Sequence, residues 1–273
     1  MNKKLIGVSL ALMLTASVAL TGCGGAKAED PVADGVLKIG TNDTYVPLEY
    51  RDENNEMVGF DIDLGNAIAE DMGVKPEWVS TAWDGIFNGL NANQYDVIIS
   101  GTSITPERVE GFSMSDPYIT NGIVIVSRND GTPAKAPKDL AGKKVGVQIE
   151  TTADYAAEAL KKSEGIEFEI NKFDAMMDGF AALEGKSIDY IMTDQPVGQF
   201  YTKLKPNVYS VTSDILSNEP IGVTMRKGDA EFAKKMNETL KKLKDNGKMV
   251  ELSMKWFGKD VTQNISTELK IIE

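Results

Sequence analysis

Hydroxyl groups, a glycine and an arginine lie close together in residues 97–118. The cluster Ser100-Gly101-Thr102-Ser103 directly follows an apolar run, and Thr105-Pro106-Glu107-Arg108 comes next. Thr105 suits the N-cap of a helix and Pro106 its first turn. A helix start offers unpaired N–H groups, and an arginine can pair with both oxygens of a planar anion. The segment predicts either a site that grips a carboxylate or a capped surface helix with a solvated arginine.

The composition excludes several kinds of chemistry. The 273 residues include no histidine and one cysteine, Cys23. A His-based triad, a histidine metal ligand and a disulfide are therefore excluded. The formal net charge of −12 argues against a basic patch that would bind nucleic acid. We expect no metal, no cofactor and no nucleic-acid partner. If the protein were an enzyme, its catalytic groups would have to be carboxylates, lysine, tyrosine or serine.

Residues 1–22 have the pattern of a secretory signal peptide. Lys3 and Lys4 precede an apolar run that ends at Leu20 and is short for a membrane span. The following residues, with Cys23 at their end, resemble a bacterial lipobox, which implies lipid attachment at Cys23. The other interpretation is an ordinary signal peptide with a chance cysteine. Residues 23–35 are small, polar and charged, and we expect them to form a flexible tether.

Strands and helices are expected to alternate along the rest of the chain, as in parallel β/α units. The first series begins with a strand at 36–41, and its apolar spacing predicts a helix over 61–72 that Gly73 ends. A second series starts with a strand at 144–148. A long amphipathic helix over 229–246 follows it.

Two apolar strands bracket the second series, so the chain is expected to cross between two lobes twice. We expect residues 36–122 and 223–273 to form the first lobe and residues 123–222 the second. The hinge crossings are expected near 121–126 and 219–225. A cleft between two hinged lobes is a natural site for a ligand.

Seven segments of the chain carry the motifs of one known family, in the family's order. They are GTNDTYVPLEY (40–50), VGFDIDLGNAIAEDMG (58–73), WDGIFNGLNANQYDVIISGTSITPER (83–108), FSMSDPY (112–118), DLAGKKVGVQIETTADY (139–155), GKSIDYIMTDQPV (185–197) and NGKMVELSMKWFG (246–258). The chain resembles the extracytoplasmic amino-acid-binding proteins of bacterial ABC importers, solute-binding protein family 3. The resemblance implies an α/β fold of the type II periplasmic-binding-protein kind, in which a two-strand hinge joins two lobes around the ligand.

The resemblance also implies a function and a place in the cell. The protein would capture an amino acid, close its lobes on it and deliver it to ABC permease and ATPase subunits, without catalysis. Lipid on Cys23 would hold it at the outer face of the cytoplasmic membrane. We expect it to act as a monomer.

In this family, five matching residues hold the ligand's α-carboxylate and α-ammonium groups. Gly101 would donate its N–H to the carboxylate, Ser103 its hydroxyl or N–H, and Arg108 would form an ion pair. Thr152 of the second lobe would reach the same carboxylate, and Asp194 would accept the α-ammonium. Because these residues belong to opposite lobes, closure would depend on the ligand.

Five other positions are expected to contact or sense the ligand's side chain. Tyr45 and Trp83 would flank it, although isolated aromatic residues more often belong to a core. Asn42 stands where relatives that recognise basic ligands often have aspartate; asparagine there weakens a simple lysine or arginine assignment and allows glutamine or another polar ligand. Gln148 can both donate and accept, whereas Glu150 would either contact a cationic side chain or lie at the rim. We expect a polar or basic L-amino acid.

Two alternatives stay open. A lyase on the same fold, similar to cyclohexadienyl dehydratase, would use acids in the cleft such as Asp194 or Glu150. An amino-acid sensory receptor would bind the same ligand and signal through a partner chain.

Overall fold

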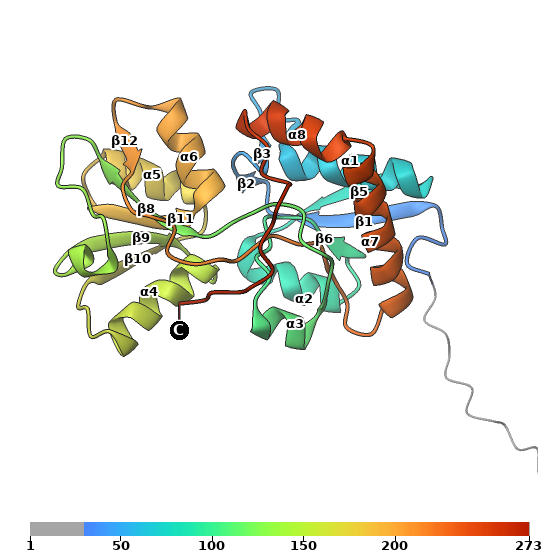
Figure 1. Ribbon diagram of the computed structural model, residues 1–273, viewed down its shortest axis with the longest axis horizontal. Coiled ribbons are helices and arrows are strands. Elements are labelled where there is room, and N and C mark those ends of the chain that lie inside the picture. The colour runs from blue at the N-terminus through green and yellow to red at the C-terminus, as the bar shows by residue number, and fades with distance from the viewer. Residues whose placement is uncertain (1–29, 273) are drawn as a thin grey trace, which may run out of the picture.

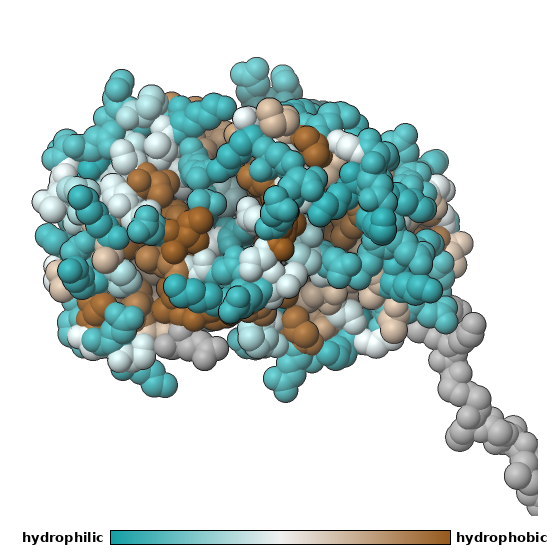
Figure 2. All heavy atoms as spheres, viewed as in Figure 1, coloured by the Kyte–Doolittle hydropathy of each residue, from teal (hydrophilic) through white to brown (hydrophobic). Residues whose placement is uncertain are grey.

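A computed structural model describes residues 30–272, which form two α/β lobes side by side (Figure 1). Figure 2 shows the heavy atoms of the same view coloured by hydropathy, and hydrophilic residues cover much of this face. The expected signal peptide and Cys23 lie outside the described residues. Among residues 30–272, no helix has both the length and the apolar character needed to cross a bilayer.

The first lobe is built on a five-stranded sheet with the order β5-β1-β6-β13-β7. Its strand β1 (Val36–Thr41) pairs in parallel with β5 (Lys75–Ser80) and β6 (Val97–Ile98), as expected of β/α units. The distant strand β13 (Thr224–Met225) pairs antiparallel with β6 and with β7 (Ser113–Met114). The sheet is therefore complete only after the chain has returned from the second lobe.

Helices α1 (Phe60–Met72), α7 (Ala230–Asp245) and α8 (Lys248–Phe257) pack against one another on this lobe. Gly73 ends α1 in the left-handed conformation, as its position predicts. The remaining elements of the lobe are β2 (Thr44–Tyr45), β3 (Glu49–Arg51), β4 (Met57–Val58), the 3₁₀ turn η1 (Trp83–Gly85), α2 (Ile86–Asn91) and α3 (Pro106–Gly111).

The second lobe has its own five-stranded sheet with the order β10-β9-β11-β8-β12. Strand β9 pairs in parallel with β10 and β11, whereas β8 pairs antiparallel with β11 and β12. The elements are β8 (Ile123–Arg128), η2 (Pro137–Leu140), β9 (Lys144–Gln148), α4 (Thr152–Ser163), β10 (Glu169–Phe173), α5 (Met176–Glu184), β11 (Tyr190–Asp194), α6 (Gln195–Leu204) and β12 (Tyr209–Val211).

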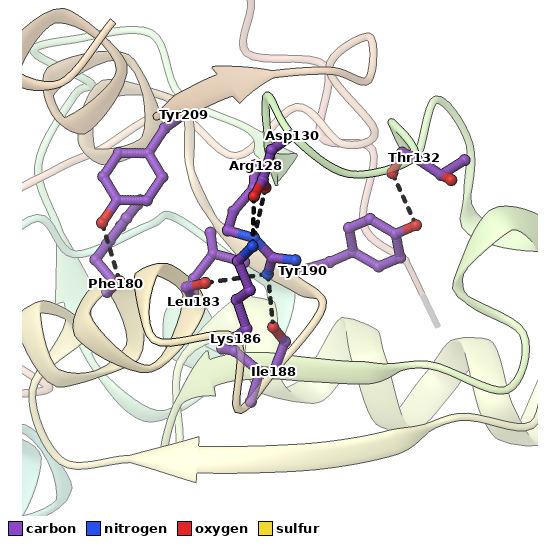
Figure 3. Close-up of polar contacts among 9 residues, drawn as sticks. All are labelled: Arg128, Asp130, Thr132, Phe180, Leu183, Lys186, Ile188, Tyr190 and Tyr209. Carbon is purple, nitrogen blue, oxygen red and sulfur yellow. Dashed lines mark hydrogen bonds and ion pairs between the residues drawn. The ribbon is translucent and has the colours of Figure 1, made fainter. Parts of the chain in front are cut away.

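A polar network anchors the outer end of this sheet (Figure 3). The Nη1 of Arg128 donates to the carbonyls of Leu183 and Ile188, each at 3.1 Å, and its Nε donates to Asp130 at 3.0 Å. The bonds to Leu183 and Ile188 tie the end of β8 to the last turn of α5 and to the loop after it. The register pairs Asp194 with the start of β8, so Asp194 lies at the opposite end of the sheet from this network.

Two chain crossings join the lobes and are hydrogen-bonded to each other. The N–H of Glu219 donates to the carbonyl of Asn121 at 3.0 Å, and that of Ile221 to Ile119 at 3.1 Å. The first crossing leads into β8 and the second into β13. Two paired crossings of this kind form a hinge, about which one lobe can rotate relative to the other.

Residues 30–35 depart from the expected tether. Val32 is buried in the hydrophobic core of the first lobe, and the N–H of Ala33 donates to the carbonyl of Asp30 at 2.9 Å. Lys235 on α7 pairs with Asp30 at 3.3 Å. The tether assignment is therefore wrong for these residues, because one apolar side chain and one ion pair hold them on the lobe.

The C-terminal residues also depart from the expected assignment of 223–273 to the first lobe. After α8, the chain passes across both hinge strands toward the second lobe (Figure 1). The N–H of Thr120 donates to Val261 at 3.0 Å, and Asn218 and Lys270 exchange backbone bonds of 2.8 and 3.1 Å. Ile272 packs against the hydrophobic core of the second lobe. Residues 259–272, here called the C-terminal strap, therefore contact both lobes.

The side chain of Asn218 offers a test of how firmly the strap is held. Its Nδ2 donates to the carbonyls of Ser266 and Glu268, at 3.2 and 2.6 Å. Each such bond contributes about 0.5–1.5 kcal/mol, so Asn218→Ala should loosen the strap by roughly 1–2 kcal/mol. We expect amide hydrogen exchange at Lys270 to become roughly tenfold faster. The exposed Gln263→Ala change on the same strap is the control, and equal exchange in both variants would contradict the prediction.

Candidate functional site

Ten residues from both lobes line a small cavity at the hinge side of the interlobe cleft. They are Tyr45, Trp83, Ser100, Gly101, Ser103, Arg108, Gln148, Thr151, Thr152 and Asp194. The cavity encloses about 10 Å³, room for about one water. An amino-acid-sized molecule can therefore enter only when the lobes part.

Direct hydrogen bonds between the lobes close this cleft. The hydroxyl of Tyr45 donates to Oδ2 of Asp194 at 2.7 Å. The Nε1 of Trp83 donates to the carbonyl of Glu150 at 3.0 Å. In both pairs the donor belongs to the first lobe and the acceptor to the second, so the structure is a closed conformation.

The arginine of the site is held by the loop and short helix that the sequence predicts. The N–H of Arg108 donates to the hydroxyl of the N-cap residue Thr105 at 3.2 Å. The Nη1 of Arg108 donates to the carbonyl of Ser103 at 2.9 Å. Its guanidinium lies 5.5 Å from the ring centre of Trp83 and 5.1 Å from that of Phe87. These contacts fix a cation that is 9% exposed.

Asp194 is the acid that faces this cation from the second lobe. Although it occupies the N-cap position of α6, its side chain makes no capping bond and enters the cleft instead. Its Oδ1 accepts from Asn121 Nδ2 at 2.7 Å, and its Oδ2 accepts from Tyr45. Burial raises the pKa of Asp194, while the two hydrogen bonds and the charge of Arg108 oppose that shift.

A second buried acid, Glu219, lies on the hinge behind the cavity. Its side chain is fully buried, and both carboxylate oxygens lack a hydrogen-bond partner within the described residues. Burial raises the pKa of Glu219 and the charge of Asp194 adds to that shift, whereas the charge of Arg108 opposes it. Burial lowers the pKa of Arg108, and Asp194 and Glu219 counteract it. The two acids thus help to keep the guanidinium charged.

The structure corrects the expectation that Gly101 donates its N–H to the ligand carboxylate. Its N–H donates to Oδ2 of the buried Asp61 at 2.7 Å, so the structure does not leave this N–H for an anion in the cleft. Gly101 has a φ of +55°, and a Cβ atom there would lie 2.9 Å from a methyl group of Leu48. Glycine is therefore needed for its backbone conformation and close packing.

Asn42 lies behind the cavity lining rather than in it. Its Oδ1 accepts from Nε2 of Gln148 at 3.3 Å and from the hydroxyl of Thr44 at 3.0 Å. Its Nδ2 donates to the carbonyl of Thr81 at 3.2 Å. The expected direct contact between Asn42 and a ligand is therefore not what the structure shows; Asn42 orients Gln148, which does line the cavity.

Glu150 lies at the rim. Its side chain is exposed and does not line the cavity. Its backbone is in the left-handed region, with a φ of +57°, and its N–H donates to Asp154 at 2.9 Å. The strained turn directs the carbonyl toward Trp83 and leaves the side chain in solvent, so of the two interpretations the structure favours the rim over direct contact with a ligand.

Some residues of the site had no individual role assigned from the sequence. Ser100, which belongs to the predicted hydroxyl cluster, and Thr151 both line the cavity. Thr151 is the N-cap of α4, accepting from the N–H of Asp154 at 3.3 Å, and the local pattern could have revealed it. Asn121 on the hinge donates to Ser103 at 3.3 Å and to Asp194, contacts that no sequence pattern signals.

Two lobes, a paired hinge and a closed cleft with one buried cation and one buried acid define a hinged ligand-binding protein. Comparison with known families gives the same class. The model of the bacterial extracellular solute-binding proteins, family 3, matches residues 37–259, and the chain belongs to this family.

Three similar proteins illustrate the family. The L-cystine-binding protein TcyJ of Escherichia coli strain K12 is 30% identical over 231 residues, which are 84% of this chain and 85% of the relative. The structure of an ancestral arginine-binding protein bound to arginine is 38% identical, with a TM-score of 0.78 over 82% of this chain and 99% of that one. An ancestral amino acid-binding protein described as a precursor of cyclohexadienyl dehydratase is 38% identical, with a TM-score of 0.76 over 82% and 96% of the two chains.

Proposed function

We propose that this protein is the substrate-binding component of an ABC importer that captures a polar or basic L-amino acid. The observation that carries the proposal is that Arg108 on the first lobe and Asp194 on the second line the same cavity. A zwitterion needs one cation and one anion at a short distance, and these two groups supply both. The names of the relatives, which bind cystine and arginine, support an amino acid as ligand.

The α-carboxylate would be bound on the first lobe. Arg108 has guanidinium N–H groups beyond the one given to Ser103, and these can form an ion pair with the carboxylate. The hydroxyl or N–H of Ser103 and the first turn of α4 at Thr152 are the further donors. Because Thr152 belongs to the second lobe, its contact would form only on closure.

The α-ammonium would be bound by Asp194. In the closed structure Tyr45 and Asn121 donate to this carboxylate, and an ammonium group would share or replace those bonds. Exchange of a neutral donor for a charged one strengthens the hydrogen bond, which favours the ligand-bound closed form.

The ligand side chain would be selected by Tyr45, Trp83 and Gln148, with Asn42 fixing Gln148 from behind. The aromatic rings suit an aliphatic stem or a guanidinium, and the amide of Gln148 can donate or accept. These groups support a polar or basic side chain. Glu150 at the rim would add negative potential and make no direct contact.

The protein would perform no catalysis and would act as a monomer with an ABC permease and its ATPase subunits. The relative that preceded a dehydratase is itself described as amino acid-binding, which supports binding over the lyase alternative.

We also propose that Cys23 carries lipid and holds the protein at the outer face of the cytoplasmic membrane. Metabolic labelling with palmitate tests this, because Cys23→Ser should abolish the label.

A thermal-shift screen against L-cystine and the twenty standard amino acids tests the proposal. A ligand at 100 times its dissociation constant adds about 2.7 kcal/mol of stability, which raises the melting temperature by roughly 5–10 °C for a chain of this size. We expect shifts with a small set of polar or basic L-amino acids and none with their D-enantiomers. No shift with any amino acid would contradict the proposed function.

A further inference from the structure

Two carboxyl groups are buried side by side beneath the cavity, on the first lobe. Glu49 of β3 and Asp61 of α1 both have 0% of their surface exposed. Within residues 30–272, neither forms an ion pair with a lysine or arginine. Two adjacent charges without a cation would strongly destabilise a protein interior, so the pair needs another explanation.

Asp61 holds the loop that lines the cavity. Its Oδ2 accepts the N–H of Gly101 at 2.7 Å. The hydroxyl of Tyr118 donates to the two oxygens of Asp61, at 3.0 and 2.9 Å. Asp61 is therefore well supplied with donors and suits the ionised form.

Glu49 holds the neighbouring residue of the same loop. Its Oε1 accepts from the hydroxyl of Ser100 at 2.8 Å, and the oxygen of Ser100 in turn accepts the N–H of Asn42 at 2.9 Å. Within the described residues, the other oxygen of Glu49, Oε2, is buried and has no donor partner. The two acids bind consecutive residues, Ser100 and Gly101, and the N–H of Asp61 donates to the carbonyl of Leu48, the residue before Glu49, at 2.8 Å, so the two carboxyl groups are neighbours. A proton on Oε2 of Glu49 would therefore complete a hydrogen bond between the two carboxyl groups.

We propose that Glu49 and Asp61 are positioning residues for ligand capture: a proton on Glu49 joins the two carboxyl groups, and the joined pair holds Ser100, Gly101 and Asn42 in place. The consequence for the ligand, but not the bridge itself, rests on the proposed function. Ser100 and Gly101 line the cavity and lead into Ser103, and Asn42 orients Gln148. One pair of buried acids would thus fix both the carboxylate-binding loop and the side-chain-sensing amide.

The pKa shifts of the pair agree with a shared proton. Burial raises the pKa of Glu49 well above its ordinary value, and the charge of Asp61 adds to the shift. Burial raises the pKa of Asp61 to about 6, against the hydrogen bonds from Gly101 and Tyr118. The other titratable groups that face the pair are Tyr118, Tyr45 and Asp194, and they carry no positive charge that would favour a second ionisation.

A proton on Glu49 in the folded protein makes its free energy of unfolding depend on pH. An unfolded glutamate ionises near its ordinary pKa of 4.5, whereas the folded protein keeps the proton on Glu49. The contribution of Glu49 to the free energy of unfolding therefore falls as pH rises from 4.5 toward its raised pKa. Glu49→Gln keeps a donor toward Asp61 and an acceptor for Ser100 but cannot ionise, so it should gain stability relative to the wild type across that range.

The experiment compares Glu49→Gln, Glu49→Ala and Asp61→Ala in the full chain. Unfolding in urea from pH 4.5 to 8.5 needs no ligand, and hydrogen exchange at the N–H of Gly101 reports directly on the loop. We expect slow exchange in the wild type and Glu49→Gln, and exchange at least about tenfold faster in the two alanine variants. The exposed Glu53→Gln change, in the turn after β3, is the matched control and should follow the wild-type pH curve.

Calorimetry with L-arginine, L-glutamine and L-cystine then tests the effect on capture. Glu49→Gln should bind within about threefold of the wild type, and the alanine variants at least about tenfold more weakly.

Parallel pH curves for Glu49→Gln and the wild type would overturn the shared proton, and equal Gly101 exchange in all variants would overturn the positioning role. If the wild type bound none of the three ligands, the proposed function would be in question, whereas the pH and exchange results would still decide on the bridge.

Discussion

Arg108→Ala is expected to weaken amino-acid binding by about 2–5 kcal/mol, which is a loss of roughly 30- to 5,000-fold in affinity. The reason is that the α-carboxylate would enter a closed cleft in which, among residues 30–272, this guanidinium, 9% exposed, is the only lining cation. Without Arg108, the ligand's negative charge would be buried beside Asp194 with no ion pair. Isothermal titration calorimetry measures the change directly.

Two further variants separate the charge of Arg108 from its geometry. Arg108→Lys keeps a positive charge but loses the planar fork and the stacking on Trp83 and Phe87, so its affinity should lie between the wild type and the alanine variant. Arg51→Ala removes an arginine that pairs with Asp43 away from the cavity and should leave affinity unchanged. An alanine variant at position 108 that bound as tightly as the wild type would refute the carboxylate assignment.

Asp194→Asn is expected to weaken binding by about 2–3 kcal/mol, because a charge-assisted hydrogen bond to the ammonium becomes a neutral one. The asparagine keeps the shape of the side chain, and one oxygen can still accept from Tyr45 or Asn121. The loss would therefore report the charge rather than a collapsed cleft. Calorimetry with the amino acid and with its α-N-acetyl derivative gives the sharpest readout.

The acetylated compound lacks the ammonium group and should bind the wild type far more weakly than the free amino acid. In Asp194→Asn the two compounds should differ much less, because the group that distinguishes them is gone. Asp178→Asn, an exposed change in the first turn of α5, is the control. An undiminished preference of Asp194→Asn for the free amino acid would show that the ammonium is bound elsewhere.

The affinity should also depend on pH through Asp194. Burial raises the pKa of this carboxyl group, so it takes up a proton at a higher pH than the ordinary value of 3.8. Protonation would remove the acceptor charge that the ammonium needs. We therefore expect affinity to fall in mild acid, before most surface carboxylates titrate, and to change less with pH in Asp194→Asn.

Short-range patterns in the sequence predicted much of this protein. The Thr105 cap and Pro106 predicted the start of α3, apolar spacing predicted α1, and Gly73 predicted its end. Such signals depend on residues within one or two helical turns, so they can be recognised without the rest of the fold. The family motifs placed Arg108 and Asp194 in one site, although 86 positions separate them.

Tertiary structure decided which polar groups are free to act. The N–H of Gly101 is taken by Asp61, 40 positions earlier in the chain, and Asn42 is taken by Gln148 of the other lobe. Both are buried hydrogen bonds between distant segments. Because a buried donor must find a partner, the three-dimensional neighbours rather than the local sequence determine whether it can serve a ligand.

The same reason explains the C-terminal strap and the buried pair of acids. Residues 259–272 have no strong helix or strand pattern, and the exposed backbone groups of the hinge and the core of the second lobe determine where they lie. Glu49 and Asp61 have ordinary carboxyl side chains in the sequence, and only their joint burial makes a shared proton necessary. The sequence thus determines the type of fold and the charged ends of the cleft through local spacing. The partners of each buried polar group depend on contacts between residues far apart in the chain, which exist only once the lobes have folded and closed.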